Sequence, residues 1–424
     1  MSVADRVHRC ISEDRLRDDV TTNANFGAIA TDRGNGRTVL TGTDANRRAR
    51  EYFVDRLETA GLEVRVDAVG NVAGRWVPES ADPEAAPVAV GSHLDSVPEG
   101  GIFDGVLGVY AGLEAVRAMR AADLDLARPV EVVCFTEEEG ARFSNGVLGS
   151  SVASGRRSVA DALALEDDDG VTLESALSDV GFHGTGRLDA SEWDSWLELH
   201  VEQGERLTDA GAAVGLVTSI TGTIRCSVEI RGEANHSGST TMAERTDALT
   251  AASELVLAVE EATQDLVAAH GDTVVGTVGK LDVSPNAVNV VPGTVELGID
   301  VRDVRYDSME TIVGRVRDCL ADLEATRGVE TAFERPYDIA PSQMSERCTD
   351  ALRNAVSAVD VPSLELHSGA GHDTMHVASV TDAGMLFAPS EGGFSHSPLE
   401  WTDWDSCATA TRVLTAGLVN LARE

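Results

Sequence analysis

The chain has 424 residues, and its 71 acidic side chains against 34 basic ones give a formal net charge of −37 and a pI near 4.5. A surface this acidic repels nucleic-acid phosphates and anionic membrane surfaces, so both classes of partner are excluded. An acidic protein from an ordinary cell is one explanation. Because molar salt shortens the Debye length to about 3 Å and so screens the self-repulsion, the charge favours an extreme halophile instead.

The first part of the chain alternates between helical spacing of apolar residues and short β-branched runs. This alternation is typical of an open α/β sheet. An acid-rich stretch at 164–170 predicts a solvated loop between helices. The predicted elements are, in chain order, a helix over 46–60, one strand over 62–76, a strand over 87–95, a helix over 105–124 and a strand over 129–136.

From about residue 216 the pattern changes to the order β-α-β-β-α-β, which is that of a ferredoxin-like domain. Strands are predicted over 222–234, 273–283, 294–304 and 330–334, with helices over 245–266 and 307–325. The α/β pattern then resumes with a strand over 383–389 and a helix over 402–422. We therefore expect an α/β protein whose open mixed sheet belongs to a catalytic domain of residues 1–215 and 335–424. A ferredoxin-like α+β domain, residues 216–334, is expected to be inserted into it.

The cysteines and the N-terminal sequence bear on the cellular compartment. Six cysteines are scattered without C-x-x-C spacing, which argues against a disulfide framework or a thiolate zinc site and fits a reducing compartment. The first twenty residues contain no apolar signal-peptide core, and no apolar run reaches the roughly 18 residues needed to span a bilayer. We expect a cytoplasmic protein.

Five short polar segments lie beside predicted strand ends. In open α/β sheets, ligands bind at the carboxyl ends of the strands. The segments are GSHLDSV (91–97), GGIFDGVLGV (100–109), FTEEEGARF (135–143), LELHVEQG (197–204) and GGFSHSPLE (392–400).

The first three segments contain residue types suited to metal binding. A strand ending in His-x-Asp can present His93 to a metal ion while Asp95 holds the other ring nitrogen. Asp104 lies on a glycine-flanked turn before a helix, where one carboxylate can reach two ions. Glu138 and Glu139 are neighbours, so one can bind metal while the other points at a bound water.

Two further imidazoles, those of His200 and His396, complete the set. Each residue alone has a simpler explanation, since single buried histidines are usually hydrogen-bonded core groups and acidic runs are usually solvated. The repeated context, with an apolar strand before and a glycine after, instead favours a two-metal hydrolytic site. Nitrogen and oxygen ligands without sulfur suit Zn²⁺, Mn²⁺, Co²⁺ or Ni²⁺.

With these motifs the sequence resembles the hydantoinase/carbamoylase-type metal-dependent amidohydrolases. This group includes N-carbamoyl-L-amino-acid hydrolase, allantoate amidohydrolase and β-ureidopropionase. The resemblance runs from Gly70–Asn71 to the C-terminal SHSPLE. The spacing of eleven residues between His93 and Asp104 is short, as in carbamoylases, and His200 stands where peptidase relatives place a carboxylate. Both features favour ureido substrates over peptides.

The resemblance implies two divalent metal ions per subunit, Zn²⁺ or Mn²⁺ with Co²⁺ or Ni²⁺ as alternatives. It implies that His93, Asp104 and His200 hold one ion, that Asp104, Glu139 and His396 hold the other, that Glu138 is the general base and acid, and that Asp95 orients His93.

The resemblance also implies a set of substrate residues, which are Gln203, His236, Asn289, Arg302 and Gly371. His236 would stabilise the developing oxyanion and so counts among the catalytic residues. Arg302 would bind the substrate carboxylate through its planar guanidinium, and Gly371 would contact it through the backbone. The loop after His236 departs from the usual TTPM, because it reads STTM with Thr241 in the proline position.

These features predict a hydrolase of a carbamoyl or ureido C–N bond, most simply one that converts an N-carbamoyl-L-amino acid to the amino acid, CO₂ and ammonia. Allantoate amidohydrolase is the first alternative, and an aminoacylase or dipeptidase with the same metals is the second. A non-catalytic binding protein on the same fold is disfavoured by the intact Glu138. The resemblance further implies a homodimer formed through the inserted domain, with His236, Asn289 or Arg302 able to act across the subunit boundary.

Overall fold

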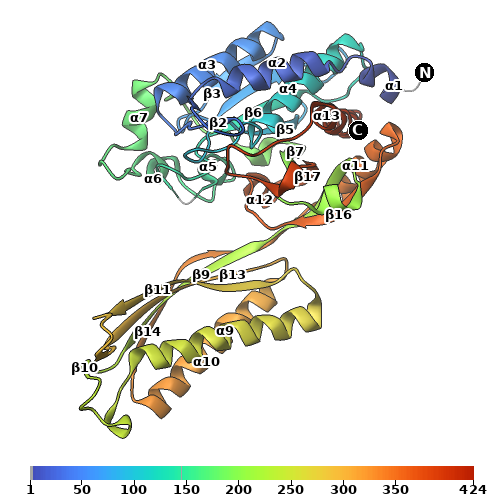
Figure 1. Ribbon diagram of the computed structural model, residues 1–424. Coiled ribbons are helices and arrows are strands. Elements are labelled where there is room, and N and C mark those ends of the chain that lie inside the picture. Colours follow the sequence, from blue (N-terminus) through green and yellow to red (C-terminus); the bar gives the residue numbers. More distant parts are fainter. Residues whose placement is uncertain (1–2, 145) are drawn as a thin grey trace. The chain divides into compact units, whose positions relative to one another are not determined.

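The computed structural model describes residues 3–144 and 146–424, which form two compact units (Figure 1). The first unit consists of Met1–Thr218, Gln343–Leu366 and His372–Glu424, and the second of Ser219–Ser342 and His367–Gly371. The second unit therefore ends later than the predicted 334. The reason is that its last strand, β14 (Glu330–Ile339), keeps its pairing with β9 as far as Ile339.

A mixed sheet runs through the first unit in the order β15-β8-β17-β7-β5-β6-β4-β3, with β16 also paired to β8. Strands β17, β7, β5 and β6 are mutually parallel, whereas the pairs β4–β6, β3–β4 and β17–β8 are antiparallel. The strands are β3 (Glu63–Val66), β4 (Val72–Trp76), β5 (Val88–His93), β6 (Val130–Phe135), β7 (Ser195–Val201), β8 (Val214–Ile220), β15 (Ser342–Gln343), β16 (Ser363–Ser368) and β17 (Asp382–Ala388).

Helices cover both faces of this sheet, which is why β5, β6 and β7 are buried along their whole length. One face carries α2 (Glu13–Ala24), α3 (Asp44–Thr59), α4 (Val106–Ala121), α11 (Glu346–Val359) and α13 (Trp404–Ala422), and the other carries α5 (Leu148–Ala153) and α12 (Thr374–Val377) (Figure 1). The smaller elements are α1 (Val3–His8), β1 (Ala28–Ile29), β2 (Gly36–Arg37), α6 (Val159–Leu163), α7 (Leu173–Asp179), η1 (Ala190–Glu192), α8 (Arg206–Ala210) and η3 (Glu391–Gly393).

The prediction of one strand over 62–76 is wrong, because the chain turns back in the middle of it. β3 and β4 are antiparallel neighbours. In the turn, Oδ1 of Asp67 accepts hydrogen bonds from the amides of Val69 and Asn71, and Gly70 has a φ of +84°. An aspartate that bonds its own backbone beside a left-handed glycine is a turn signal that outweighed the β-branched residues around it.

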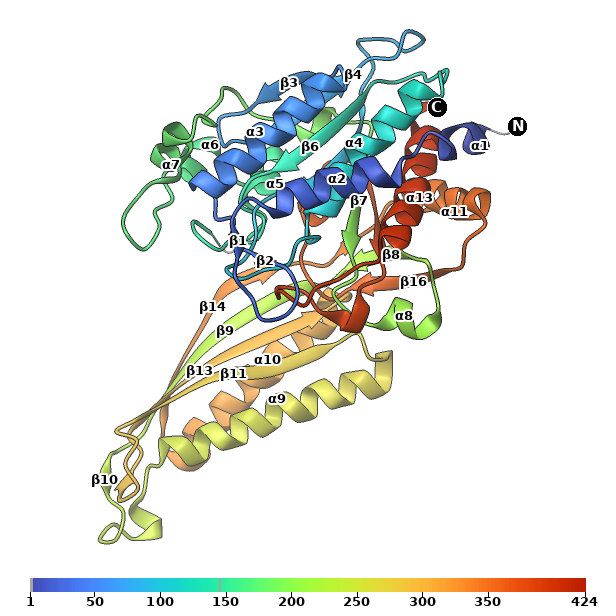
Figure 2. The same ribbon diagram turned by 45° about the horizontal axis from the view of Figure 1, so that its top comes forward.

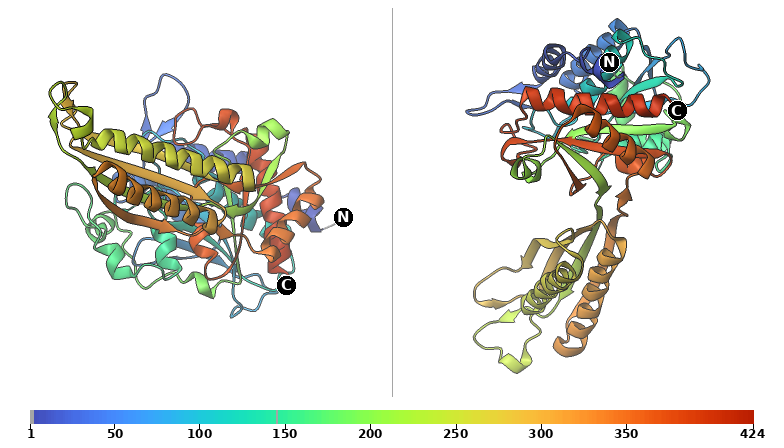
Figure 3. Two further views of the ribbon diagram at one scale, coloured as in Figure 1. Left: turned by 90° about the horizontal axis from the view of Figure 1, so that it is seen from below. Right: turned by 90° about the vertical axis from the view of Figure 1, so that its right-hand side faces the viewer.

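The second unit is a four-stranded antiparallel sheet in the order β11-β13-β9-β14, with α9 and α10 on one face (Figure 3). Its elements follow the predicted β-α-β-β-α-β order, with two short paired strands and one turn of 3₁₀ helix in addition. They are β9 (Gly222–Arg231), β10 (Asn235–His236), η2 (Met242–Glu244), α9 (Ala248–His270), β11 (Val275–Ser284), β12 (Val290–Val291), β13 (Thr294–Asp303), α10 (Tyr306–Arg327) and β14.

Two expectations about the chain as a whole can be compared with the structure. All six cysteines lie in the described ranges and are free thiols. Within those same ranges, every helix is too short or too polar to cross a bilayer.

Candidate active site

The parallel strands of the first unit bring distant motifs to one edge of the sheet. His93 ends β5, Glu138 follows the end of β6, and His200 lies near the end of β7. His396 lies in the loop after β17, the next parallel strand. Asp104 lies two residues before the start of α4, the helix that follows β5. The carboxyl ends of these neighbouring strands therefore surround one site, as the strand order requires.

Two buried histidines meet one oxygen of Asp104. Its Oδ1 lies 3.4 Å from Nε2 of His93 and 3.1 Å from Nε2 of His200. Each ring is held from behind, since Nδ1 of His93 lies 3.2 Å from the carbonyl oxygen of Asp95, and Nδ1 of His200 lies 2.9 Å from that of Val201. A carbonyl oxygen only accepts, so each Nδ1 carries a proton and each Nε2 faces Asp104.

The other oxygen of Asp104 faces a second group. Nε2 of His396 lies 3.7 Å from Oδ2 of Asp104 and 3.2 Å from Oε2 of Glu139. The His396 side chain is 51% exposed, so this group lies on the solvent side of the first. Asp104 thus contributes to both clusters with potential to hold a metal ion, one of His93, Asp104 and His200 and one of Asp104, Glu139 and His396.

The spacing of these donors fits divalent ions. Ligands about 2.0–2.1 Å from a tetrahedral zinc ion lie roughly 3.3 Å from one another, close to the observed separations. The donors are imidazole nitrogens and carboxylate oxygens, the set that suits Zn²⁺, Mn²⁺, Co²⁺ or Ni²⁺. Among the residues that the structure describes, the buried Nε2 of His93 has no hydrogen-bond partner, which is costly for a polar atom unless something binds it.

Charges within the cluster shift the ionisation of its members. Burial works against ionisation of Asp104, but His200 and His93 hold the pKa of Asp104 well below its usual range. Burial also opposes protonation of His93, yet Glu138, Asp104 and Asp95 raise the pKa of His93 well above its usual value. The acidic groups of the cluster therefore draw positive charge to themselves, which is the electrostatic condition for binding cations.

Glu138 is placed to exchange a proton at the cluster. Its Oε2 lies 3.6 Å from Nε2 of His93. Burial, together with the carboxylates of Asp373 and Glu139 and despite the opposing effect of His93, raises the pKa of Glu138 well above its usual range. A bound cation would lower that pKa again, because positive charge nearby favours the carboxylate.

Asp95 contacts the site differently from the prediction that its side chain holds the ring of His93. Its Oδ1 lies 3.8 Å from Nδ1 of His93, and the closer contact comes from its backbone carbonyl. Its Oδ2 accepts a hydrogen bond of 3.1 Å from the amide of Glu139. The side chain therefore fixes the Glu138–Glu139 turn, while the main chain orients His93.

Gln203 lies at this cluster as well. Its amide nitrogen lies 3.0 Å from Oδ2 of Asp104 and 3.0 Å from Oγ of Ser395. Oγ of Ser395 is itself 3.0 Å from the same oxygen of Asp104. Ser395 was not among the predicted residues, although it adjoins His396 in the quoted SHSPLE segment.

The remaining predicted residues lie in the second unit, where they form two pairs. His236 and Asn289 are close because β10 pairs with β12 and the amide of Ser237 donates to the carbonyl oxygen of Asn289. Nδ1 of His236 accepts hydrogen bonds from the amides of Gly238 and Ser239, at 3.0 and 3.2 Å. Nε2 of this ring must therefore carry the proton, which makes His236 a hydrogen-bond donor on its open side.

Arg302 and Gly371 form the other pair. Nη1 of Arg302 donates to the carbonyl oxygen of Gly369 at 3.1 Å, and its Nε donates to Oδ1 of Asp300 at 2.9 Å. Gly371 is two residues further along the same loop. The departure at Thr241 has a structural counterpart, since its hydroxyl donates to Glu244 in a capping box that fixes the loop without a proline.

Buried polar groups around the site include two that the sequence analysis missed, Glu400 and Arg37. Glu400 lies four residues after His396 and is 1% exposed, and burial together with nearby Asp104 raises its pKa to about 7. His372 places its ring centroid 4.6 Å from that of His200. Arg37 is fully buried and comes from the N-terminal part of the chain, where nothing in the pattern marked it.

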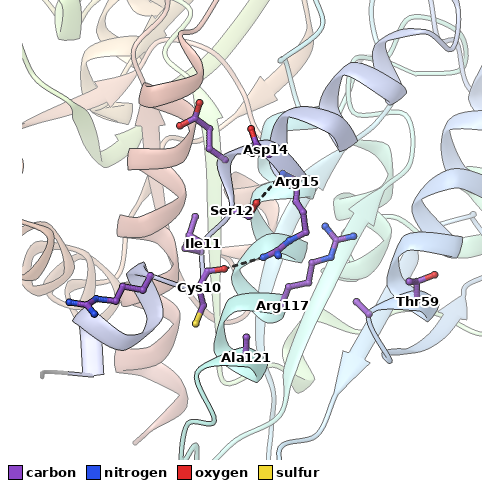
Figure 4. A pocket seen from close by; sticks show the side chains of 11 residues that line it. Cys10, Ile11, Ser12, Asp14, Arg15, Thr59, Arg117 and Ala121 are labelled. Atoms are coloured by element: carbon purple, nitrogen blue, oxygen red, sulfur yellow. Dashed lines mark hydrogen bonds between the residues drawn. The ribbon is translucent and has the colours of Figure 1, made fainter.

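A separate cavity of about 840 Å³ in the first unit does not belong to this site (Figure 4). Its wall includes Arg15 and Arg117, which suggest an anion site at first sight. Arg15 is paired with Glu114 at 2.6 Å, and Arg117 with Asp19 at 2.6 Å. Because these guanidinium groups are already neutralised, the cavity offers little attraction to an anion.

Comparison with known proteins places the chain in a family. The model of "Peptidase family M20/M25/M40" matches residues 89–420. An N-carbamoyl-L-amino-acid amidohydrolase of Paenarthrobacter aurescens is 37% identical over 406 residues, covering 95% of this chain and 96% of the relative. Allantoate amidohydrolase of Bacillus subtilis (strain 168) is 34% identical over 414 residues, covering 96% and 97%.

The fold gives the same result. The crystal structure of a hydantoinase/carbamoylase family amidase from Burkholderia multivorans aligns with a TM-score of 0.89 at 34% identity, covering 98% of each chain. The resemblance inferred from the sequence motifs is confirmed, and the chain belongs to peptidase family M20/M25/M40 as a relative of the hydantoinase/carbamoylase amidohydrolases.

Proposed function

We propose that this protein is a dinuclear metal-dependent amidohydrolase that hydrolyses the carbamoyl C–N bond of an N-carbamoyl-L-amino acid, releasing the L-amino acid, CO₂ and ammonia. The observation that carries the proposal is Asp104, whose two oxygens face two separate ligand groups. The presence of His200 rather than a carboxylate in the first group, and relatives that hydrolyse N-carbamoyl amino acids, favour this substrate class.

The metal centre is proposed with Asp104 as the bridging ligand. The first ion would be held by His93, Asp104 and His200, and the second by Asp104, Glu139 and His396. Zn²⁺ or Mn²⁺ fits this donor set best, with Co²⁺ or Ni²⁺ as alternatives. Such a pair of ions, when bound, would supply a water of lowered pKa and a Lewis acid for the substrate carbonyl.

Glu138 is the proposed general base and acid. Its carboxylate takes a proton from the attacking water and returns it to the leaving nitrogen, as its position beside His93 and its raised pKa allow. Asp95 holds the turn that carries Glu138, through its bond to the amide of Glu139.

The roles of the substrate residues are proposed from the hydrogen-bond donors that their side chains present. His236 presents a protonated Nε2, so it can donate to the oxygen that gains negative charge in the transition state. Arg302, beside the Gly369–Gly371 loop, is suited to the substrate carboxylate. Gln203 and Asn289 supply amide groups for the ureido end.

The positions of these residues in the second unit support a homodimer. Arg302 pairs with Thr223 near the start of β9, whereas Asn289 precedes Thr294 at the opposite end of β13. Eight residues of antiparallel strand span about 27 Å, and an N-carbamoyl amino acid is only roughly 8 Å long. Figure 2 shows β10, which carries His236, at the tip of this sheet. If both pairs contact one substrate, they must come from different copies of the chain.

The surface of the second unit favours such pairing. β11 is an edge strand, with its outer backbone groups free to pair, and it exposes Val275 and Leu281. Leu257 on the adjacent α9 is also exposed. An exposed edge strand beside apolar side chains is a typical dimerisation surface, so the homodimer is proposed to form here.

A substrate panel tests the proposed activity. N-carbamoyl, N-acetyl and dipeptide forms of the same L-amino acid, together with allantoate, are compared in molar KCl with Zn²⁺, Mn²⁺ or Co²⁺ added in turn. The highest kcat/KM is expected for the N-carbamoyl form. Preference for allantoate would move the assignment to allantoate amidohydrolase, and preference for the N-acetyl or dipeptide form would contradict a ureido substrate.

The role of Glu138 is tested separately. Glu138→Gln keeps the shape of the side chain but cannot accept the proton, so kcat should fall by at least about 100-fold. Metal content should stay near two ions per subunit, because Glu138 is not a proposed ligand. A variant with the wild-type kcat would show that another group transfers the proton.

A further inference from the structure

The loop that carries Asp104 is held from one side by Glu400. Oε1 of Glu400 accepts hydrogen bonds from the amides of Phe103, at 2.8 Å, and Asp104, at 3.0 Å. Its carboxyl group occupies the space beside Gly101, where a Cβ atom would lie 2.3 Å from Oε1. The glycine at 101 thus makes room for a buried carboxylate that binds the backbone of the bridging residue.

Arg37 holds the same loop from the other side. Its amide donates to the carbonyl oxygen of Gly100 at 3.0 Å, and its Nε donates to that of Gly101 at 3.1 Å. The far end of the guanidinium donates to Oδ1 of Asn23 at 2.9 Å and approaches the carbonyl oxygen of Asp95 at 3.5 Å. Arg37 therefore joins the Asp104 loop to the backbone that follows His93.

Together these two residues bind four backbone groups of the loop, two carbonyl groups and two amides. Neither side chain touches the proposed ligand atoms, and both are buried. Burying polar and ionisable groups is costly, and the hydrogen bonds to the loop offset part of that cost. Asp104 must direct one oxygen to each ligand group, and a small rotation of its backbone would misplace both.

We propose that Arg37 and Glu400 form a clamp that positions Asp104 to bridge two metal ions, and that they act through the backbone without contacting metal or substrate. They are positioning residues. Glu400 lies four residues after His396, so it also ties the loop of one ligand to the loop of another. The inference rests on the proposed metal centre and is independent of the choice of substrate.

Conservative variants test the clamp. Glu400→Asp keeps the charge but retracts the carboxylate by one methylene, and Arg37→Lys keeps the charge but loses the planar set of donors. Metal dissociation constants are measured by chelator competition on the full-length protein in molar KCl. Both variants should bind metal about 10- to 100-fold more weakly, the usual effect of removing a residue that orients a ligand. Glu400→Gln retains an acceptor oxygen at the same position and should bind close to wild type.

A matched control separates positioning from general stability. Glu131 is another fully buried carboxylate of the first unit, bonded to Arg65 and to the indole of Trp193, and it lies near the start of β6, at the opposite end of that strand from the ligands. Glu131→Asp should lower the melting temperature while leaving metal affinity unchanged. With metal at saturation, the clamp variants should lose kcat while KM stays near wild type, because the substrate residues are untouched.

The outcomes are distinct. Wild-type metal affinity in folded Glu400→Asp and Arg37→Lys would overturn the clamp, as would an equal loss of affinity in Glu131→Asp. A loss in Glu400→Gln as large as in Glu400→Asp would also overturn it, because the acceptor oxygen would then be irrelevant. Failure of the wild-type protein to bind two ions would instead refute the proposed metal centre, and this is measured first.

Discussion

Gly105 stands directly against the imidazole of His93. A Cβ atom at Gly105 would lie 2.5 Å from three ring atoms of His93, and the residue has a φ of +67°. The glycine after Asp104 therefore serves two needs, the left-handed backbone that starts α4 and the close approach of a ligand ring.

We predict that Gly105→Ala displaces His93 and weakens metal binding by at least about tenfold, as loss of ligand orientation commonly does. Metal affinity is measured by chelator competition, and the far-ultraviolet circular dichroism should stay unchanged. Gly181→Ala is the control, because Gly181 has a φ of +76° with nothing within 4 Å of its added Cβ. Gly181→Ala therefore introduces the same left-handed backbone strain without a clash of the added Cβ atom. Equal metal binding in wild type and Gly105→Ala would show that the ring can move without loss.

Mixing two inactive variants tests whether the substrate residues act across a dimer. A heterodimer of Glu138→Gln and His236→Ala has one site with both defects and one with neither, provided that His236 acts in the partner's site. Random mixing at equal amounts makes half of the dimers heterodimers, so activity should recover to about a quarter of wild type. If His236 acts within its own subunit, each site keeps one defect and the mixture stays inactive.

The controls for this experiment use the same chains. Glu138→Gln mixed with Glu139→Ala places both defects in the first unit, so no recovery is expected from any exchange between subunits. Subunit exchange itself is followed by size-exclusion chromatography and by a tag on one variant. A strictly monomeric, fully active enzyme would exclude the arrangement.

The sequence predicted the ligand segments because each is a local pattern, an apolar strand followed by polar residues and glycine. Parallel strand order then brings those strand ends together, as seen for His93 and His200. The clamp had no such signal, since Arg37 meets Gly101 across 64 residues and Glu400 meets Phe103 across 297. Contacts of that range depend on how loops pack, which a single sequence does not encode in any short motif.

The strand register explains a second feature of the site that could not be predicted from the sequence. Asn289 and Arg302 are thirteen residues apart in the sequence, a spacing that gave no indication of distance in space. Only the pairing of β13 with β9 shows that Arg302 lies at the end of the sheet opposite to the end of β13 that follows Asn289. The turn at Gly70 was missed for a related reason, because β-branched residues on both sides concealed a break of only a few residues.

His376 should make the fold sensitive to acid. It is 5% exposed and its Nδ1 has no hydrogen-bond partner; burial, with Arg156 and Arg157 nearby, lowers the pKa of His376 to about 4. An unfolded histidine titrates near 6.5, so the unfolded state binds the proton more tightly and stability falls as pH drops below that value. Between pH 7 and pH 5 the loss should be about 2 kcal/mol.

Urea unfolding of the metal-free protein in molar KCl measures this, because metal release at low pH would otherwise contribute. His376→Gln should lose correspondingly less stability between pH 7 and pH 5. His183→Gln, a change at a half-buried histidine bonded to Ser178, serves as the control and should keep the wild-type pH dependence. The same pH dependence in His376→Gln and wild type would contradict the assignment.

Salt should control substrate binding before it controls folding. The chain carries a net charge of −37, and the proposed substrates are anions, so the protein's field repels them. Positive charge is scarce, since Lys280 is the only lysine and is paired with Asp282 at 3.0 Å, and Arg302 shares its guanidinium with Asp300. As KCl is lowered from about 3 M to about 0.5 M, the Debye length grows and KM should rise several-fold while kcat changes little.

Circular dichroism in the same series should show the fold intact over the range in which KM rises. A substrate with its carboxylate converted to an amide should show a much smaller rise, and a KM that is constant across salt would mean that local charge at the site outweighs the field of the whole chain.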